Sequence, residues 1–329
     1  MVDLNLIKEF TWSRKHLLGL ESLEKIEIEH VLELAKSLKE ILNRPVKKVP
    51  ALRGKTIALL FYEPSTRTRI SFELAAKRLS ADTVNFSVSS SSVVKGESLK
   101  DTGLNIEAMN VDIIVVRNSS AGTAHYLSKN VSAGIINAGD GMHEHPTQAL
   151  LDLFTILEYK KKISNLTVAI VGDIAHSRVA RSNIYGLKKM GARVILCGPP
   201  TMLLPEFKNL GIEISYDLNR VLECADVLNV LRIQKERINE SLFPSMAEYR
   251  EFFGVTRDRL LKYARPGLLI LHPGPVNRGV ELSPDVLDKG LIKKNIYSVV
   301  LNQVTNGLAV RMAILYLISG VGGKVEAVD

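Results

Sequence analysis

Short apolar runs rich in β-branched residues recur along the 329-residue chain and constrain its fold more than any other feature. They are continuous rather than alternating, which is typical of strands covered on both faces and predicts parallel sheet. The runs begin at Thr56, Val111, Gly134, Thr167, Ala192, Ala225 and Gly267. Helical periodicity fills the segments 22–42, 65–79, 98–109, 146–159, 177–190 and 305–318. This alternation predicts a doubly wound α/β fold, with Ser22 capping the first helix.

The length of the chain favours two such domains, since a domain typically spans roughly 100–200 residues. The first set of strands ends before the helical segment at Pro146, and a new set opens at Thr167 after a polar stretch. We therefore expect a first domain over residues 1–150 and a second over residues 151–302. The apolar C-terminal helix, within residues 303–329, has no strand after it and must pack on a domain already built.

Composition excludes several classes of protein. Hydrophobic residues make up 46% of the chain, yet no stretch approaches the roughly 20 uninterrupted apolar residues of a membrane helix. The N-terminus lacks the apolar core of a signal peptide, so we expect a cytoplasmic protein. The two cysteines, Cys197 and Cys224, lie in apolar runs and are too few for a zinc site, which predicts reduced core residues.

The net charge of +8 points to anionic ligands. The positions of the basic residues indicate which class of anion to expect. Basic residues are scattered, without an arginine-rich arm or the aromatic pattern of an RNA-binding domain, so we do not expect nucleic acid. Four arginines instead follow apolar runs singly: Arg67, Arg117, Arg178 and Arg232. An anion site in an α/β protein lies at the ends of its strands, which predicts small anionic substrates.

The densest chemical signal is the segment FYEPSTRTRISFELAAKRL at residues 61–79, where a strand runs into a helix. The amides of the first helical turn, the hydroxyls of Ser65, Thr66 and Thr68 and the guanidinium of Arg67 can converge there on an anion such as phosphate. The G-x-x-x-x-G-K pattern of a Walker loop is absent. Spacing alone is equally consistent with a capped helix that carries solvated arginines.

The Ser65–Thr68 segment resembles the carbamoyl-phosphate signature of the aspartate and ornithine carbamoyltransferase family. The motifs HPTQ at 145–148, LRIQKER at 231–237 and HPGP at 272–275 resemble that family in its order, as do Arg117, Arg178 and the stretch before Lys95. The resemblance spans nearly the whole chain. Arg232-x-Gln234-x-x-Arg237 is similar to the members that act on aspartate, whereas the S-M-G loop and H-C-L-P of ornithine enzymes are missing. Another amine as acceptor remains the alternative.

The resemblance implies transfer of the carbamoyl group of carbamoyl phosphate to L-aspartate, a step of pyrimidine biosynthesis, without metal or organic cofactor. The reaction needs donors aimed at the developing oxyanion, with two anionic substrates held together. The residues implied to bind carbamoyl phosphate are Ser65, Thr66, Arg67, Thr68, Arg117, His145 and Gln148, with Ser91 and Lys95. Of these, Arg67, Thr68, Arg117 and His145 are implied to be catalytic. The active site is expected in the cleft between the domains, with the last helix returning to the first domain.

The second substrate carries two carboxylates, which arginine grips with a two-pronged fork. The residues implied to bind aspartate are Lys95, Arg178, Arg232, Gln234, Gly274 and Pro275. Glycine replaces the leucine of the H-P-L-P found in some relatives, but family contacts there use the backbone carbonyl; we also expect a cis bond before Pro275.

The family further implies a homotrimer in which Ser91 and Lys95 act in the neighbouring chain's site. A dihydroorotase or a regulatory chain is a possible partner.

Two other readings fit the residues less well. The run from Thr167 looks like the first strand of a dinucleotide-binding domain, but residues 173–176 stand where G-x-G-x-x-G requires two more glycines. The pair His143 and His145 could hold a metal, yet no Cys, Glu or third His falls at a useful spacing along the chain. We therefore expect no cofactor and no metal. A scaffold without catalytic activity would not need so many anion-binding residues.

Overall fold

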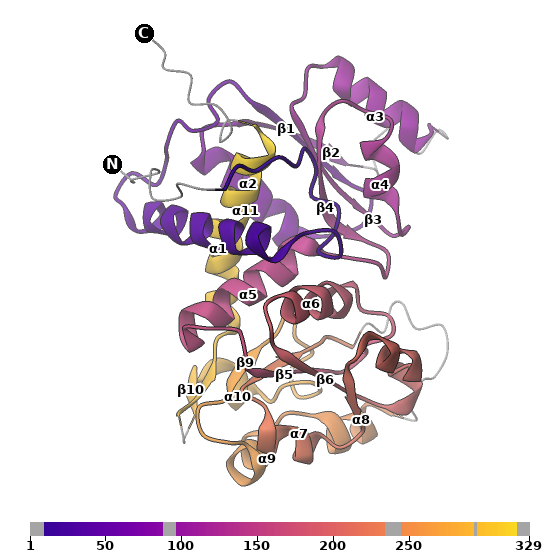
Figure 1. Cartoon of the computed structure of the whole chain (residues 1–329), viewed down its shortest axis with the longest axis vertical. Helices are drawn as coiled ribbons and strands as arrows, with labels where there is room; N and C mark the ends of the chain where they lie inside the picture. The colour runs from indigo at the N-terminus through magenta and orange to yellow at the C-terminus, as the bar shows by residue number, and fades with distance from the viewer. Residues whose placement is uncertain (1–9, 88–96, 234–244, 293–294, 321–329) are drawn as a thin grey trace. The chain divides into compact units, whose positions relative to one another are not determined.

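Two sheets organise the chain, which is described by a computed structural model at residues 10–87, 97–233, 245–292 and 295–320 (Figure 1). The contacts divide the chain into two units. Unit 1 comprises residues 1–154 and 305–329, and unit 2 comprises residues 155–304. Each unit has a sheet and a hydrophobic core of its own.

In the described part of unit 1, four parallel strands are arranged in the order β2-β1-β3-β4. They are β1 (Thr56–Phe61), β2 (Asp82–Ser87), β3 (Ile113–Asn118) and β4 (Gly134–Asp140). The helices are α1 (Lys25–Lys39), α2 (Thr66–Arg78), α3 (Leu99–Ala108) and α4 (Thr123–Ser128), and η2 (Glu40–Asn43) is a 3₁₀ turn. Two further helices, α5 (Pro146–Lys160) and α11 (Val300–Ile318), lie mostly in unit 1, and each has its remaining residues in unit 2. Helices α3 and α4 cover one face of the sheet, where Ile106 and Leu127 pack against Leu60 and Ile114, and α1, α2 and α11 lie on the other face (Figure 1).

The described sheet of unit 2 has seven strands in the order β10-β11-β9-β8-β5-β6-β7. They are β5 (Thr167–Val171), β6 (Arg193–Cys197), β7 (Glu213–Ser215), β8 (Val227–Val230), β9 (Leu269–Leu271), β10 (Leu291–Ile292) and β11 (Ile296–Ser298). The helices are α6 (Arg178–Lys189), α7 (Leu218–Cys224), α8 (Met246–Phe253), α9 (Arg257–Tyr263) and α10 (Pro284–Asp288), with 3₁₀ turns η5 (Pro200–Met202) and η6 (Pro205–Leu210). Helices α7, α8 and α9 lie on one face and α6 on the other (Figure 1).

The doubly wound α/β architecture predicted from the apolar runs is confirmed. The edge strand β10 departs from the prediction, because it pairs antiparallel with β11. The predicted cap at Ser22 is wrong, since α1 begins after Glu24. Glu27 accepts a hydrogen bond from the backbone N–H of Glu24 at 2.6 Å, while the Ser22 carbonyl accepts one from Arg14. A glutamate capping box therefore starts the helix two residues later.

The structure confirms the prediction of a buried, reduced cysteine for one of the two cysteines. Both cysteines are free; Cys197 is buried, as expected, but Cys224 is only half-buried. Burial raises the pKa of the Cys197 thiol to about 12.

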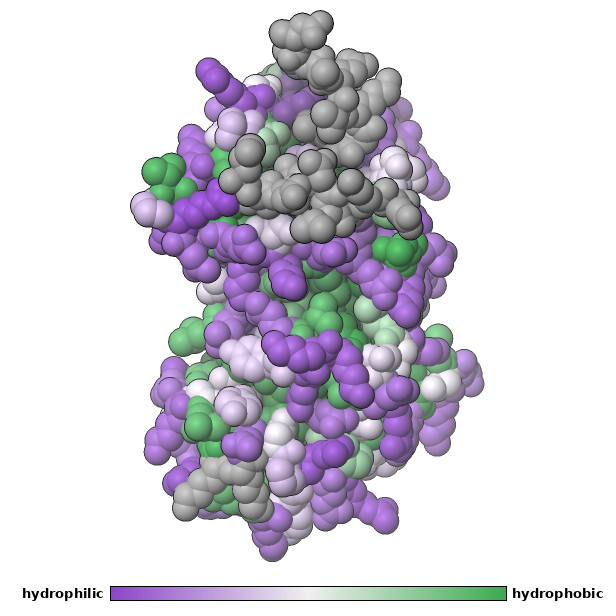
Figure 2. All heavy atoms as spheres, turned by 60° about the vertical axis from the view of Figure 1, so that its left-hand side comes forward, coloured by the Kyte–Doolittle hydropathy of each residue, from purple (hydrophilic) through white to green (hydrophobic). Residues whose placement is uncertain are grey.

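Among the described residues, no helix is both long enough and apolar enough to cross a membrane. Figure 2 shows hydrophilic residues over most of one face, with hydrophobic residues interspersed.

Candidate active site

The turn between β1 and α2 carries the predicted anion-binding segment. Strand β1 is buried from Ile57 onward, and α2 begins at Thr66 after the N-cap residue Ser65. The side chain of Ser65 makes no capping hydrogen bond, and the first turn of α2 holds no acidic residue. The first amides of a helix lack intrahelical partners and carry the positive end of its dipole. This turn can therefore receive an anion, with Arg67 exposed beside it.

Arg117 reaches the same turn from the neighbouring strand. The register of the sheet pairs Phe61 of β1 with Arg117 near the end of β3. The Nη1 of Arg117 donates to the hydroxyl of Thr68 and to the carbonyl of Ala138, both at 3.4 Å. Its Nε forms an ion pair with Glu63 at 2.7 Å, in which each side chain is 15% exposed. The structure thus brings Thr68 and Arg117 together, and Glu63 orients the guanidinium.

His145 and Gln148 follow the third neighbouring strand, β4. His145 precedes Pro146, the first residue of α5, and is buried. Its Nδ1 lies 3.4 Å from the hydroxyl of Thr147. Gln148 donates from Nε2 to Asp152 at 2.9 Å. Because β1, β3 and β4 are parallel neighbours, all of these residues gather at one edge of the sheet, outside the carboxyl ends of the strands.

Arg311 is a residue of this region that the sequence reading missed. It lies on α11, is 5% exposed and donates from Nη1 to the hydroxyl of Ser71 at 2.8 Å. Its guanidinium lies 5.2 Å from the ring centre of Phe72. Burial lowers its pKa to about 10, opposed by the charge of Asp152 and reinforced by that of Arg67. It therefore remains a buried cation at neutral pH, behind the first turns of α2. A lone arginine in an apolar helix was the signal available in the sequence.

The second group of predicted residues lies in unit 2, again after neighbouring parallel strands. Arg178 follows β5 as the first residue of α6 and is buried, and the hydroxyl of Ser177 caps this helix. Arg232 follows β8 and is half-buried. The bond between Gly274 and Pro275, after β9, is cis as predicted. Since β5, β8 and β9 are adjacent and parallel, their carboxyl ends share one edge.

Glu281 is a buried carboxylate that sequence reasoning also missed. It accepts hydrogen bonds from the backbone N–H of Ile233 at 2.9 Å and from that of Asn277 at 2.7 Å. Its Oε2 lies 3.9 Å from Nε2 of His272. Burial raises its pKa, while these hydrogen bonds oppose the shift. Glu281 therefore ties the backbone beside Arg232 to the loop that carries the cis proline.

Three predicted site residues, Ser91, Lys95 and Gln234, lie outside the residues that the structure describes. The contacts expected of them stay predictions. The other predicted residues fall into two groups, one at the strand ends of each unit. Both groups lie where doubly wound α/β proteins bind their ligands, at the carboxyl ends of parallel strands, and their arginines indicate an α/β protein that binds small anions.

Comparisons with known proteins identify the family. Residues 15–158 match the model "Aspartate/ornithine carbamoyltransferase, carbamoyl-P binding domain", and residues 164–318 match "Aspartate/ornithine carbamoyltransferase, Asp/Orn binding domain". The chain belongs to the aspartate/ornithine carbamoyltransferase family, so the resemblance drawn from its motifs is confirmed.

Similar proteins and solved structures support the same family assignment. The aspartate carbamoyltransferase catalytic subunit of Syntrophobacter fumaroxidans is 60% identical over 307 residues, covering 93% of this chain and 98% of that protein. That of Carboxydothermus hydrogenoformans is 57% identical, covering 93% and 96%. Aspartate transcarbamoylase from Trypanosoma cruzi in complex with N-(phosphonacetyl)-L-aspartic acid superposes with a TM-score of 0.82 at 28% identity, covering 93% and 96% of the chains. Ornithine carbamoyltransferase from Pyrococcus furiosus reaches 0.81 at 30% identity, covering 94% and 99%.

Proposed function

We propose that this chain transfers the carbamoyl group of carbamoyl phosphate to the amino group of L-aspartate, giving N-carbamoyl-L-aspartate and phosphate. The observation that carries the proposal is the identity of 54–60% to aspartate carbamoyltransferase catalytic subunits over more than nine-tenths of both chains. The arrangement of the described residues supports it, because one unit carries an anion-binding turn and the other carries arginines at adjacent strand ends.

The carbamoyl phosphate site is proposed at the strand ends of unit 1, within the domain assigned to residues 1–150 with the helix in 303–329. Ser65, Thr66, Arg67 and Thr68 hold the phosphate, and Arg67 neutralises it as it leaves. Arg117, His145 and Thr68 polarise the carbonyl oxygen, and Gln148 orients the carbamoyl nitrogen. The contact between Arg117 and Thr68 supports this assignment, since it brings two of the proposed donors together.

The aspartate site is proposed in unit 2, within residues 151–302. Arg178 and Arg232 each grip a carboxylate, assisted by Lys95, Gln234, and the backbone at Gly274 and Pro275. The hydrogen bond from the N–H of Gly274 to Nδ1 of His272, at 2.8 Å, supports a loop that is held in place at this position. The burial of Arg178 supports a strong grip, because a desolvated guanidinium binds a carboxylate more tightly.

The chemistry follows from these roles. The amine of aspartate attacks the carbonyl carbon, the carbon–nitrogen bond forms and negative charge develops on the carbonyl oxygen. The donors proposed around that oxygen stabilise it. The carbon–oxygen bond to phosphate then breaks, and the phosphate leaves with the electron pair and takes up the proton that the amine loses. The chain's own side chains supply positioning and charge throughout.

The first test is an assay of ureido product from carbamoyl phosphate, run in parallel with L-aspartate and with L-ornithine. We expect turnover with aspartate alone. Turnover with ornithine would retain the fold and the phosphate site but contradict the assignment of Arg178 and Arg232. The fold does not separate these acceptors, because the ornithine enzyme from Pyrococcus furiosus superposes about as well as the aspartate enzymes.

We also propose a cytoplasmic homotrimer in which Ser91 and Lys95 complete the site of the neighbouring chain; dihydroorotase or a regulatory chain is the partner to test. Mixing inactive Lys95→Ala with inactive Arg67→Ala should restore activity, because some sites then draw both intact residues from different chains. Well-mixed hybrids without activity would contradict shared sites. Co-elution with dihydroorotase tests the partner.

A further inference from the structure

A cluster of ionisable side chains in unit 1 lies outside the proposed substrate sites. His125, Asp140 and His143 each offer a ligand atom that lies within 4.8 Å of the other two. His125 belongs to α4, Asp140 ends β4 and His143 lies in the turn that follows. This cluster is not recognisable from residue spacing along the chain, because the fold brings His125 to the turn from a separate helix.

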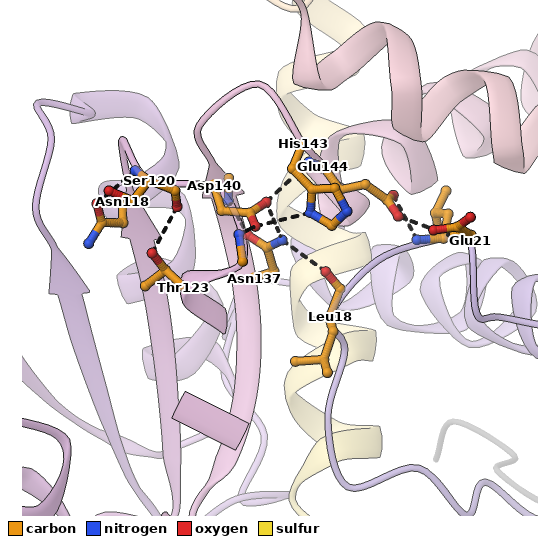
Figure 3. A network of polar contacts seen from close by, with 12 residues as sticks. Leu18, Glu21, Asn118, Ser120, Thr123, Asn137, Asp140, His143 and Glu144 are labelled. Carbon is orange, nitrogen blue, oxygen red and sulfur yellow. Dashed lines mark hydrogen bonds and ion pairs between the residues drawn. The ribbon is translucent and has the colours of Figure 1, made fainter. Parts of the chain in front are cut away.

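The geometry of the cluster suits a metal ion. The Nδ1 of His143 lies 3.0 Å from Oδ2 of Asp140 (Figure 3). The rings of His125 and His143 are 5.6 Å apart between centroids and meet edge to face at 64°. Asp140 is buried, His143 is half-buried and His125 is exposed, so the group opens toward solvent and leaves an entry path.

The carboxylate of Asp140 is held in place by its surroundings. It accepts hydrogen bonds from the N–H of Gly122 at 2.7 Å, from Nδ2 of Asn137 at 2.8 Å and from the N–H of Glu144 at 3.1 Å (Figure 3). Ligating carboxylates in metal sites are typically fixed by such hydrogen bonds. One of the three ligands is thus positioned before any ion arrives.

We propose that His125, Asp140 and His143 form a binding site for a first-row transition-metal ion, with Zn²⁺ as the ion to test. Imidazole nitrogens suit zinc, nickel and copper, whereas magnesium and calcium require mostly oxygen ligands. Tetrahedral zinc bonds of about 2.0–2.2 Å place ligand atoms about 3.3–3.6 Å apart. The distance of 3.0 Å between His143 and Asp140 is close to this range, and rotation of the exposed His125 side chain can shorten its distances to the other two ligands.

An ion bound at Nδ1 of His143 would replace the hydrogen bond to Asp140, with the proton of the neutral ring on Nε2. A second group, Glu21, His143 and Glu144, also lies within 4.8 Å but is less suitable. The carboxylate of Glu144 accepts hydrogen bonds from the N–H groups of Leu20, at 2.8 Å, and Glu21, at 3.2 Å. The ion would join α4 to the turn before α5, so zinc should raise the melting temperature of the chain.

The test uses the full chain without a histidine tag, stripped with a chelator and titrated with ZnCl₂ against a chromophoric indicator. We expect one zinc ion per chain, and at least about a tenfold loss of affinity in His125→Gln and in His143→Gln. Co²⁺ should give visible absorption bands that both substitutions abolish. Because His125 is exposed, its variant should keep the fold, which circular dichroism checks.

The chain offers a matched control in unit 2. The Nδ1 of His176 lies 2.9 Å from Asp173 and its side chain is 29% exposed, closely resembling His143. No three-ligand group found among the described residues includes it, so His176→Gln should leave zinc affinity unchanged. Failure of the wild type to bind zinc at micromolar free concentration, or wild-type affinity in His125→Gln or in His143→Gln, would overturn the site.

Discussion

The two units place arginines at the ends of neighbouring parallel strands, but they hold them in different ways. In unit 1, Arg117 is oriented by side chains, through the ion pair with Glu63 and the hydrogen bond to Thr68. In unit 2, Arg178 is buried at the start of α6, which Ser177 caps, and Glu281 anchors the backbone beside Arg232.

This difference predicts different consequences of substitution. The donors of unit 1 are arranged relative to one another, so removing one should mainly destabilise the transition state. The arginines of unit 2 are proposed to bind the carboxylates of aspartate, so replacing one should mainly weaken binding of that substrate. Kinetic parameters can separate these effects, because a lost transition-state contact lowers kcat and a lost uniform contact raises KM.

The largest effect is expected from Arg67→Ala in unit 1. Removing a donor to developing charge typically lowers turnover by about 10²- to 10³-fold. Arg67 is exposed, so the melting temperature should change little. Arg69→Ala is the matched control, since it removes an equally exposed arginine from the same helix. A folded Arg67→Ala enzyme that keeps most of its turnover would contradict the phosphate assignment.

The next largest effect is expected on stability, from Arg311→Met. The substitution removes a cation that opposes the buried carboxylate of Asp152 and donates to Ser71. Breaking such a buried arrangement costs about 3–5 kcal/mol, so the chain should melt roughly 10 °C lower. Adding Asp152→Asn should recover part of the loss, since the carboxylate no longer needs compensation. Strictly additive effects in thermal unfolding would show that the two charges are not coupled.

Much of the fold was predictable because the sequences of buried parallel strands are continuous apolar runs. The run at Thr56 corresponds to β1 and that at Thr167 to β5. Strand β2 was not predicted, because its sequence DTVNFS alternates polar and apolar residues and lies at the sheet edge. The short strands β7, β10 and β11 were missed for want of length, since two or three residues carry no periodicity.

The site was predictable where a motif is local and unpredictable where it depends on packing. Ser65 to Thr68 form one turn, so their proximity follows from sequence. Glu63, Arg311 and Glu281 act through residues distant in sequence or through backbone groups. The position of a buried charge depends on which elements pack together, and residue spacing alone does not contain that information.

A smaller effect is expected from Arg232→Lys in unit 2. The substitution retains the positive charge but loses the planar guanidinium, which can donate two hydrogen bonds to one carboxylate. A charge-assisted hydrogen bond contributes about 1.5–3 kcal/mol, so KM for aspartate should rise about 10- to 100-fold. KM for carbamoyl phosphate should stay the same. Steady-state kinetics with each substrate varied in turn measures both. A rise confined to carbamoyl phosphate would reverse the assignment of the two units to their substrates.

The smallest effect concerns the anchor itself, Glu281→Gln. Glutamine can accept from the N–H of Ile233 but presents a donor to that of Asn277, so about 1 kcal/mol of stability should be lost. Burial raises the pKa of Glu281 above 4.5, so the folded chain binds a proton more readily than the unfolded chain. The stability of the wild type relative to the variant should therefore fall as pH rises from 4.5 through the raised pKa. Urea unfolding of both proteins across this range measures the slope. A slope of opposite sign would mean that the hydrogen bonds from Ile233 and Asn277 outweigh burial, and Glu281 would then act as an ionised anchor.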